Sequence, residues 1–180
     1  MSRHFIILSN TVDCTKPLSL NNLTGYGRLD VLCRCITATF FLSNAFREDT
    51  ELSIFFRQNK QLLTIDGQHA EGINPDERSL AGVLNRIFKG KSSRGITFVH
   101  ASLEKLLTLH RPTILDVHGE NTFSQLARRD VFLLGDQAGF TNTDRQMFKR
   151  LNNMESLTLG SRVYLSSQTI AILHYLLDQS

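Results

Sequence analysis

The segment GRLDVLCRC, residues 27–35, combines charged and apolar residues in a pattern that could do chemistry. If it is helical, Asp30, Arg34 and Thr37 fall on one narrow polar stripe, because they are spaced i, i+4 and i+7. Arg28 stands just before this stripe. Two arginines around an acid suit a phosphate group and a proton that must be removed. The alternative is a simple ion pair between Asp30 and Arg34 on the solvent side of the helix.

A second mixture of acids and a cation is PDER at residues 75–78. Arg78 is its candidate binding residue, because the first turn of a helix by itself accounts for the two acids. We expect Asn74 to cap this helix and Pro75 to take its first position.

Three further segments pass from an apolar strand into a loop that contains glycine and few long side chains. They are ILDVHGEN (114–121), LLGDQAGF (133–140) and LTLGSRVYLSSQ (157–168). Gly135 would let another backbone or a ligand come close. Backbone groups would then do most of the binding, and free amides at the start of the last helix would favour a carboxylate. Ordinary strand-to-helix turns are the alternative. The sequence has no dinucleotide-binding, P-loop or G-x-S-x-G motif.

The elements that must position these residues alternate between strands and helices. Strands are expected at 4–8, 51–56, 61–65, 95–99, 113–117, 131–135 and 155–160. Helices are expected at 27–43, 74–88, 102–110, 142–151 and 164–179, the last with Leu165, Ile172, Leu173, Leu176 and Leu177 facing inward. The pattern predicts an α/β fold with a largely parallel sheet and helices on both faces. Ligands bind such sheets beyond the carboxyl ends of their strands.

Length and composition restrict the class of protein. A chain of 180 residues with 41% hydrophobic residues fits one soluble domain, and we expect residues 1–180 to form it. The net charge of +3 does not by itself indicate nucleic acid, and the basic clusters 89–94 and 127–130 support it only weakly. Three cysteines and no signal sequence or membrane span indicate a cytoplasmic protein, and we expect no metal site.

The order of these motifs resembles a known family over nearly the whole chain. The N-terminal strand, GRLDVLCRC, NPDER, FLLGDQAGF and LTLGSRVYLSSQ are similar to the archaeal-type pseudouridine N1-methyltransferases of transfer RNA. These enzymes belong to the SPOUT superfamily of methyltransferases. The resemblance implies an S-adenosylmethionine-dependent enzyme that acts on tRNA as a homodimer, with a deep C-terminal trefoil knot over about residues 113–180.

The resemblance also implies roles for particular residues. Asp30 would handle or orient the N1 proton of pseudouridine, and Arg28, Arg34 and Arg78 would bind the RNA. The cofactor would lie against Leu115, His118, Leu134, Gly135, Leu157, Thr158, Leu159, Gly160, Ser161, Leu165 and Thr169. Some relatives have a cysteine near the last of these positions. Two alternatives stay open: methylation of another RNA atom, such as a ribose 2'-oxygen or another base nitrogen, and a non-catalytic RNA-binding or assembly protein with the same fold.

Overall fold

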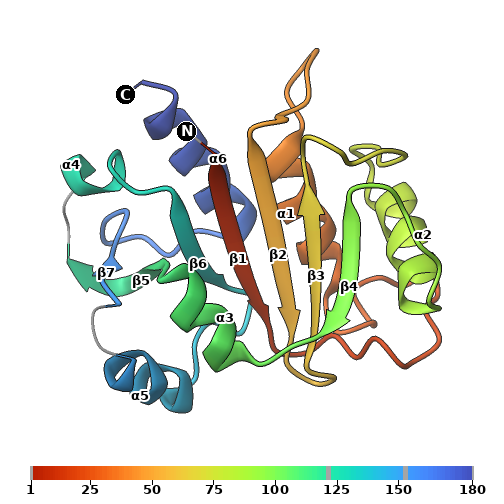
Figure 1. Ribbon diagram of the computed structural model, residues 1–180, viewed down its shortest axis with the longest axis horizontal. Helices are drawn as coiled ribbons and strands as arrows, with labels where there is room; N and C mark the ends of the chain where they lie inside the picture. Colours follow the sequence, from red (N-terminus) through yellow and green to blue (C-terminus); the bar gives the residue numbers. More distant parts are fainter. Residues whose placement is uncertain (1, 121–122, 152–153, 180) are drawn as a thin grey trace.

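One mixed sheet forms the centre of the molecule (Figure 1). The computed structural model describes residues 2–120, 123–151 and 154–179, and within them seven strands follow the order β4-β3-β2-β1-β6-β5-β7. The strands are β1 (Arg3–Ser9), β2 (Thr50–Phe56), β3 (Gln61–Asp66), β4 (Ile96–His100), β5 (Thr113–Glu120), β6 (Val131–Gly135) and β7 (Ser156–Leu157). Asn121, the end of the first predicted loop, lies outside the described residues.

The sheet is mostly parallel, which confirms the prediction. Strand β1 pairs in parallel with β2 on one side and β6 on the other, and β5 is parallel to β6 and to β7. The predicted hairpin of β2 and β3 is present, and β4 adds a second antiparallel pair at that edge. Because β1, β2 and β6 run the same way, their carboxyl ends meet at one edge of the sheet (Figure 1).

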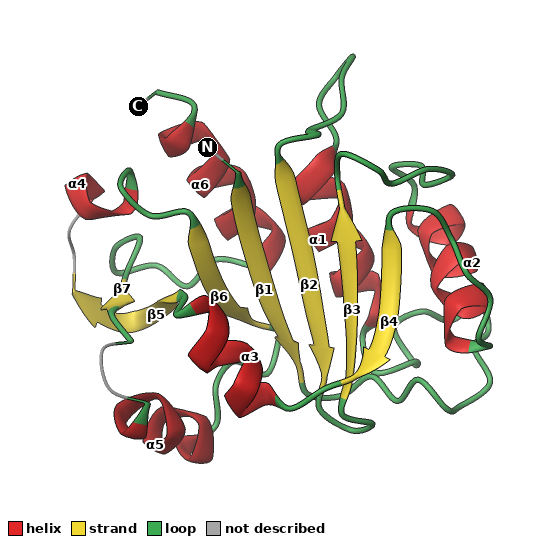
Figure 2. Ribbon diagram, viewed as in Figure 1, coloured by secondary structure: helices red, strands yellow, loops and turns green. Residues whose placement is uncertain are grey.

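Helices cover both faces of the sheet (Figure 2). The helices in the described part of the chain are α1 (Leu29–Phe40), α2 (Glu77–Phe88), α3 (Leu103–His110), α4 (Phe123–Leu126), α5 (Asn142–Arg150) and α6 (Ser166–Leu177). Buried apolar residues of α1, α2 and α6 form one core, and those of α3 and α5 form the core on the other face. No helix in the described residues is long and apolar enough to cross a membrane.

One local prediction about helices was wrong, and a second was only partly right. Asp76, not Asn74, caps α2, because its carboxylate accepts a hydrogen bond from the Ser79 amide at 2.8 Å and the helix begins at Glu77. In α6, the buried positions are Thr169, Ile170, Leu173 and His174. Of the five residues expected to face inward, Leu173 is buried and Leu176 and Leu177 pack against the core as predicted, whereas Leu165 is 50% exposed.

Long-range polar contacts explain why α6 also buries a histidine that the apolar pattern did not predict. The His174 ring donates from Nε2 to the Thr39 carbonyl at 3.0 Å, and its Nδ1 lies 2.9 Å from the Arg3 guanidinium. Thr39 belongs to α1 and Arg3 to β1. These partners turn a polar side chain toward the core, which an apolar pattern alone does not indicate.

Candidate functional site

The three predicted loops meet around two adjoining cavities at the carboxyl edge of the sheet. The cavities measure about 180 Å³ and about 90 Å³ and share the wall formed by Leu115, Val163, Tyr164 and Thr169. The predicted cofactor residues that line at least one cavity are Leu115, Leu134, Gly135, Thr158, Leu159 and Thr169. All three loops therefore contribute to the walls of these cavities, and cofactor binding there stays a prediction.

The other predicted cofactor residues do not line these cavities. They are His118, Leu157, Gly160, Ser161 and Leu165. Leu157 pairs with β5 from the edge strand β7, and its side chain is fully buried in the hydrophobic core. Leu165 precedes α6 and gives the helix no side-chain cap, so the first amides of α6 are not held by a capping side chain.

Sequence reasoning missed a charged pair in the wall of the larger cavity. Asp116 follows the apolar start of β5, and its carboxylate pairs with the Arg145 guanidinium of α5. The Asp116 side chain is only 6% exposed, although the residue lies near the carboxyl edge of the sheet, where the loops begin. The sequence places Asp116 in the first predicted loop. It does not indicate the partner of Asp116, because Arg145 lies 29 positions away.

Gly135 has a close backbone neighbour in addition to the cavity. A Cβ atom at this position would lie 2.8 Å from the Cα of Gly139, which is too close for any side chain. The small size of Gly135 therefore lets the 136–139 turn fold back over the strand end. Gly135 also lines the larger cavity, and its carbonyl accepts a hydrogen bond from the Ser166 hydroxyl at 2.5 Å.

The polar stripe of α1 forms a compact charged cluster. Arg28 donates to both carboxylate oxygens of Asp30, from Nε at 3.0 Å and from Nη2 at 3.1 Å, and Arg34 pairs with the same carboxylate. Asp30 is 5% exposed, whereas the two arginine side chains are 44% and 40% exposed. The ion pair expected from the spacing is present, but its acid is buried beneath two guanidinium groups that face solvent.

The two arginines control the ionisation of Asp30. Hydrogen bonds from Arg28 are the main reason that the Asp30 pKa lies below its usual range, and the positive charges of Arg28 and Arg34 lower it further. Burial opposes this effect without overcoming it. The hydrogen bonds with Asp30 also raise the Arg28 pKa. At neutral pH the cluster is thus an ionised acid between two cations, and its carboxylate is a weak base.

A sharp turn places Arg28 over the start of its own helix. Gly27 and Arg28 both have left-handed backbone conformations, with φ of 61° and 65°. A Cβ on Gly27 would lie 2.3 Å from the Thr11 carbonyl oxygen, so this position requires glycine. The turn directs the Arg28 side chain toward Asp30 instead of away from the helix.

Hydrogen bonds connect this cluster to the loop at the cavity. The Thr11 hydroxyl donates to the Gly27 carbonyl at 2.7 Å and accepts from the Gln137 amide at 2.8 Å. Asn10, one residue earlier, donates to Asp136 and to the Gly139 carbonyl, both at 3.0 Å. Asp136 and Gly139 line the larger cavity, so the end of β1 joins the charged cluster to the candidate ligand site.

Arg78 lies beside the same cluster but is already engaged. Its guanidinium donates to the Asn21 side chain at 2.6 Å and thereby holds the long loop after β1. Glu77, the preceding residue, lies 3.8 Å from Arg34. The structure thus places the charged segments 27–35 and 75–78 next to each other, and Arg78 lies at the border of the Asp30 cluster.

The fold matches that of a solved protein. The Nep1 protein of Archaeoglobus fulgidus, solved with bound S-adenosylhomocysteine, superposes with a TM-score of 0.73 over 99% of this chain and 98% of its own, at 14% sequence identity. This chain and Nep1 therefore share one α/β fold, and in this chain the two cavities lie at the carboxyl edge of the sheet.

Sequence comparison identifies the family. Residues 2–180 match the family described as "Putative SAM-dependent RNA methyltransferase", and the chain belongs to this family. A tRNA (pseudouridine(54)-N(1))-methyltransferase of Methanocorpusculum labreanum is 30% identical over 94% of this chain and 93% of its own. The enzyme with the same name from Haloarcula marismortui is 29% identical over 98% of this chain and 96% of its own. The protein is therefore an S-adenosylmethionine-dependent RNA methyltransferase.

Proposed function

We propose that this protein methylates N1 of a pseudouridine in transfer RNA. The observation that carries the proposal is the chain of hydrogen bonds through Gly27, Thr11 and Gln137, which joins the Arg28 and Asp30 cluster to the cavity loop. A substrate group held by the cluster would lie beside a ligand in the cavity. The names of the relatives, which specify pseudouridine and its N1 atom, support the same reaction.

The residues around the cavities suit S-adenosylmethionine. Leu115, Leu134 and Leu159 offer apolar surface, and the amides at the start of α6 are suited to the carboxylate of its methionine part. The cofactor supplies a methyl group activated by a positively charged sulfur. The cavities of about 180 Å³ and 90 Å³ are smaller than the roughly 300 Å³ or more of most ligand sites. Val163 and Tyr164 line both cavities, so a change in the positions of these side chains would join the two into one larger site.

The charged cluster suits the nucleotide. Pseudouridine is attached to its sugar through carbon and keeps a free N1 proton, which uridine lacks. Arg28 and Arg34 are exposed and would bind a backbone phosphate or a base carbonyl, with Arg78 at the border. Asp30 fixes both guanidinium groups and would accept a hydrogen bond from N1–H. Because its pKa is lowered, orienting this proton suits Asp30 better than removing it.

The proposal includes the architecture implied by the resemblance. The last strands and α6 would form the deep trefoil knot, and two subunits would build the enzyme in the cytoplasm. The fold likeness to Nep1 supports the knot. Exposed apolar residues before and within α6, namely Val163, Tyr164, Leu165 and Tyr175, support a subunit interface.

Mass spectrometry of the product nucleoside tests the reaction. The purified protein is incubated with S-adenosylmethionine and two tRNA transcripts that differ only in pseudouridine or uridine at the target site. We expect N1-methylpseudouridine from the first transcript and no methylation of the second. A 2'-O-methyl product, or methylation of both transcripts, would contradict the proposal. Absence of any product, with RNA binding intact, would support a non-catalytic RNA-binding protein.

A further inference from the structure

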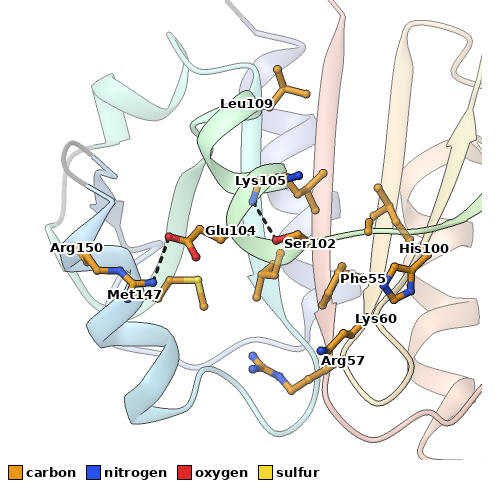
Figure 3. A pocket seen from close by; sticks show the side chains of 14 residues that line it. Phe55, Arg57, Lys60, His100, Ser102, Glu104, Lys105, Leu109, Met147 and Arg150 are labelled. Carbon is orange, nitrogen blue, oxygen red and sulfur yellow. Dashed lines mark hydrogen bonds and ion pairs between the residues drawn. The ribbon is translucent and has the colours of Figure 1, made fainter.

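A larger groove lies outside the proposed active site. It measures about 760 Å³ and is bounded by the ends of β2, β3 and β4 on one side and by α3 and α5 on the other. Figure 3 shows Arg150 and Met147 entering from α5, Glu104 and Lys105 from α3, and Lys60 and His100 from the strand side. None of the predicted site residues lines it.

The groove combines apolar walls with positive charge. Phe55, Leu62, Leu106 and Met147 contribute apolar surface, and Leu109, which is 77% exposed, extends it toward solvent. Four cations, Arg57, Lys60, Lys105 and Arg150, line the groove against one acid, Glu104. Such a surface fits a ligand that is anionic along one side and flat and apolar along the other.

Two of these cations are not engaged by acids. Arg57 pairs with the buried Asp144 of α5, and Arg150 lies 3.2 Å from Glu104. Lys60 and Lys105 have no ion pair among the residues that the structure describes. Their charges are therefore free to meet anionic groups of a ligand, and the exposed His100 ring beside them offers a surface for stacking.

Helix α5 separates this groove from the candidate cofactor cavity. Arg145 of α5 lines the cavity, whereas Met147 and Arg150 line the groove on another side of the same helix. A helix of this length, Asn142–Arg150, spans only about 13 Å. One extended strand of nucleic acid could contact both places.

We propose that this groove binds a single-stranded segment of the substrate RNA next to the target nucleotide, a step that rests on the proposed function. Lys60 and Lys105 bind phosphate groups, and an unstacked base lies on the apolar wall against His100. An acidic protein segment is the alternative occupant. RNA fits better because the groove and the cavity flank one short helix.

Binding of fluorescently labelled tRNA tests the groove. We expect Lys60→Gln/Lys105→Gln to bind tRNA about tenfold more weakly, with a slope against salt concentration reduced by roughly one to two. The matched control Lys91→Gln/Lys149→Gln removes the same charge outside the groove and should bind almost as wild type. Affinity for S-adenosylmethionine, measured by calorimetry, and thermal stability should not change in either variant.

His100→Ala tests the stacking surface separately. We expect roughly five- to tenfold weaker binding of tRNA with an unchanged salt slope, because a base contact carries no charge. Equal losses for the groove variant and its control would overturn the proposal, as would lysine-dependent binding of a glutamate-rich peptide in place of RNA. Failure of the wild type to methylate RNA, with the groove effect intact, would refute only the proposed function.

Discussion

At the scale of single residues, the orientation of Arg28 and Arg34 depends on Asp30. We expect Asp30→Asn to reduce methyl transfer by about a hundredfold or more, the usual range for positioned proton-handling groups. The amide cannot hold two guanidinium groups as an ionised carboxylate does. Single-turnover rates, measured with S-adenosylmethionine affinity, check this expectation, because the affinity should stay at the wild-type value.

The arginine variants distinguish a substrate role from a structural one. Arg28→Ala and Arg34→Ala should weaken tRNA binding and lower its salt slope by about one each. The exposed pair of Glu71 and Arg94 provides the control, since Arg94→Ala removes an ion pair whose residues line neither cavity. Normal turnover with only a small loss of stability would mean that the Asp30 cluster serves the helix alone.

At the scale of elements, His174 holds α6 against α1 and β1. Burial, with the nearby charges of Arg47 and Arg3, lowers the His174 pKa from 6.5 to about 4, and the hydrogen bond to Thr39 and the charge of Asp178 oppose this only partly. The unfolded chain therefore binds a proton between pH 6.5 and 4 that the folded protein does not, so stability falls as the pH is lowered through this range. His4, with a pKa lowered to about 3, has an effect of the same sign.

His174→Gln tests this coupling through urea unfolding at pH 7 and pH 5. We expect a loss of about 1–2 kcal/mol at pH 7 from weakened hydrogen bonds. The variant should also lose less stability than wild type between the two pH values, because one titrating group is gone. Replacement of the exposed His118 by glutamine is the control for histidine loss. An unchanged pH dependence in His174→Gln would contradict the assignment.

Sequence patterns predicted the strands and helices better than the contacts between them. Apolar runs placed β1, β2 and β6 correctly, and the hairpin of β2 and β3 followed from its short turn. The burial of His174 in α6 and the pairing of Asp116 with Arg145 depend on residues far apart in the sequence. The periodicity of apolar residues within one element cannot predict such pairs. The three loops that line the cavities were recognised from their glycines, but their polar connections through Asn10 were missed.

At the scale of the whole molecule, we expect a homodimer formed through α6 and the segment before it. Val163 is 81% exposed and Tyr175 is 65% exposed, and burial of both in a second subunit would stabilise the pair. Light scattering at micromolar concentration should give twice the chain mass of 20.4 kDa. Val163→Asp/Tyr175→Asp should give the single-chain mass, whereas Leu109→Asp, an equally exposed site on α3, should not. A wild-type protein of 20.4 kDa would contradict the interface.

The place of β1 in the sheet has a consequence for synthesis of the chain. Strand β1 is made first, yet one of its two neighbours, β6, begins only at Val131. Before β6 has left the ribosome, the nascent protein can form only the β4-β3-β2-β1 part of the sheet. In that part, Phe5 to Leu8 lie along an edge of β1 that has no partner strand. Such an edge is a template for pairing between chains. The nascent chain is therefore most prone to aggregate in the interval before β6 closes the sheet.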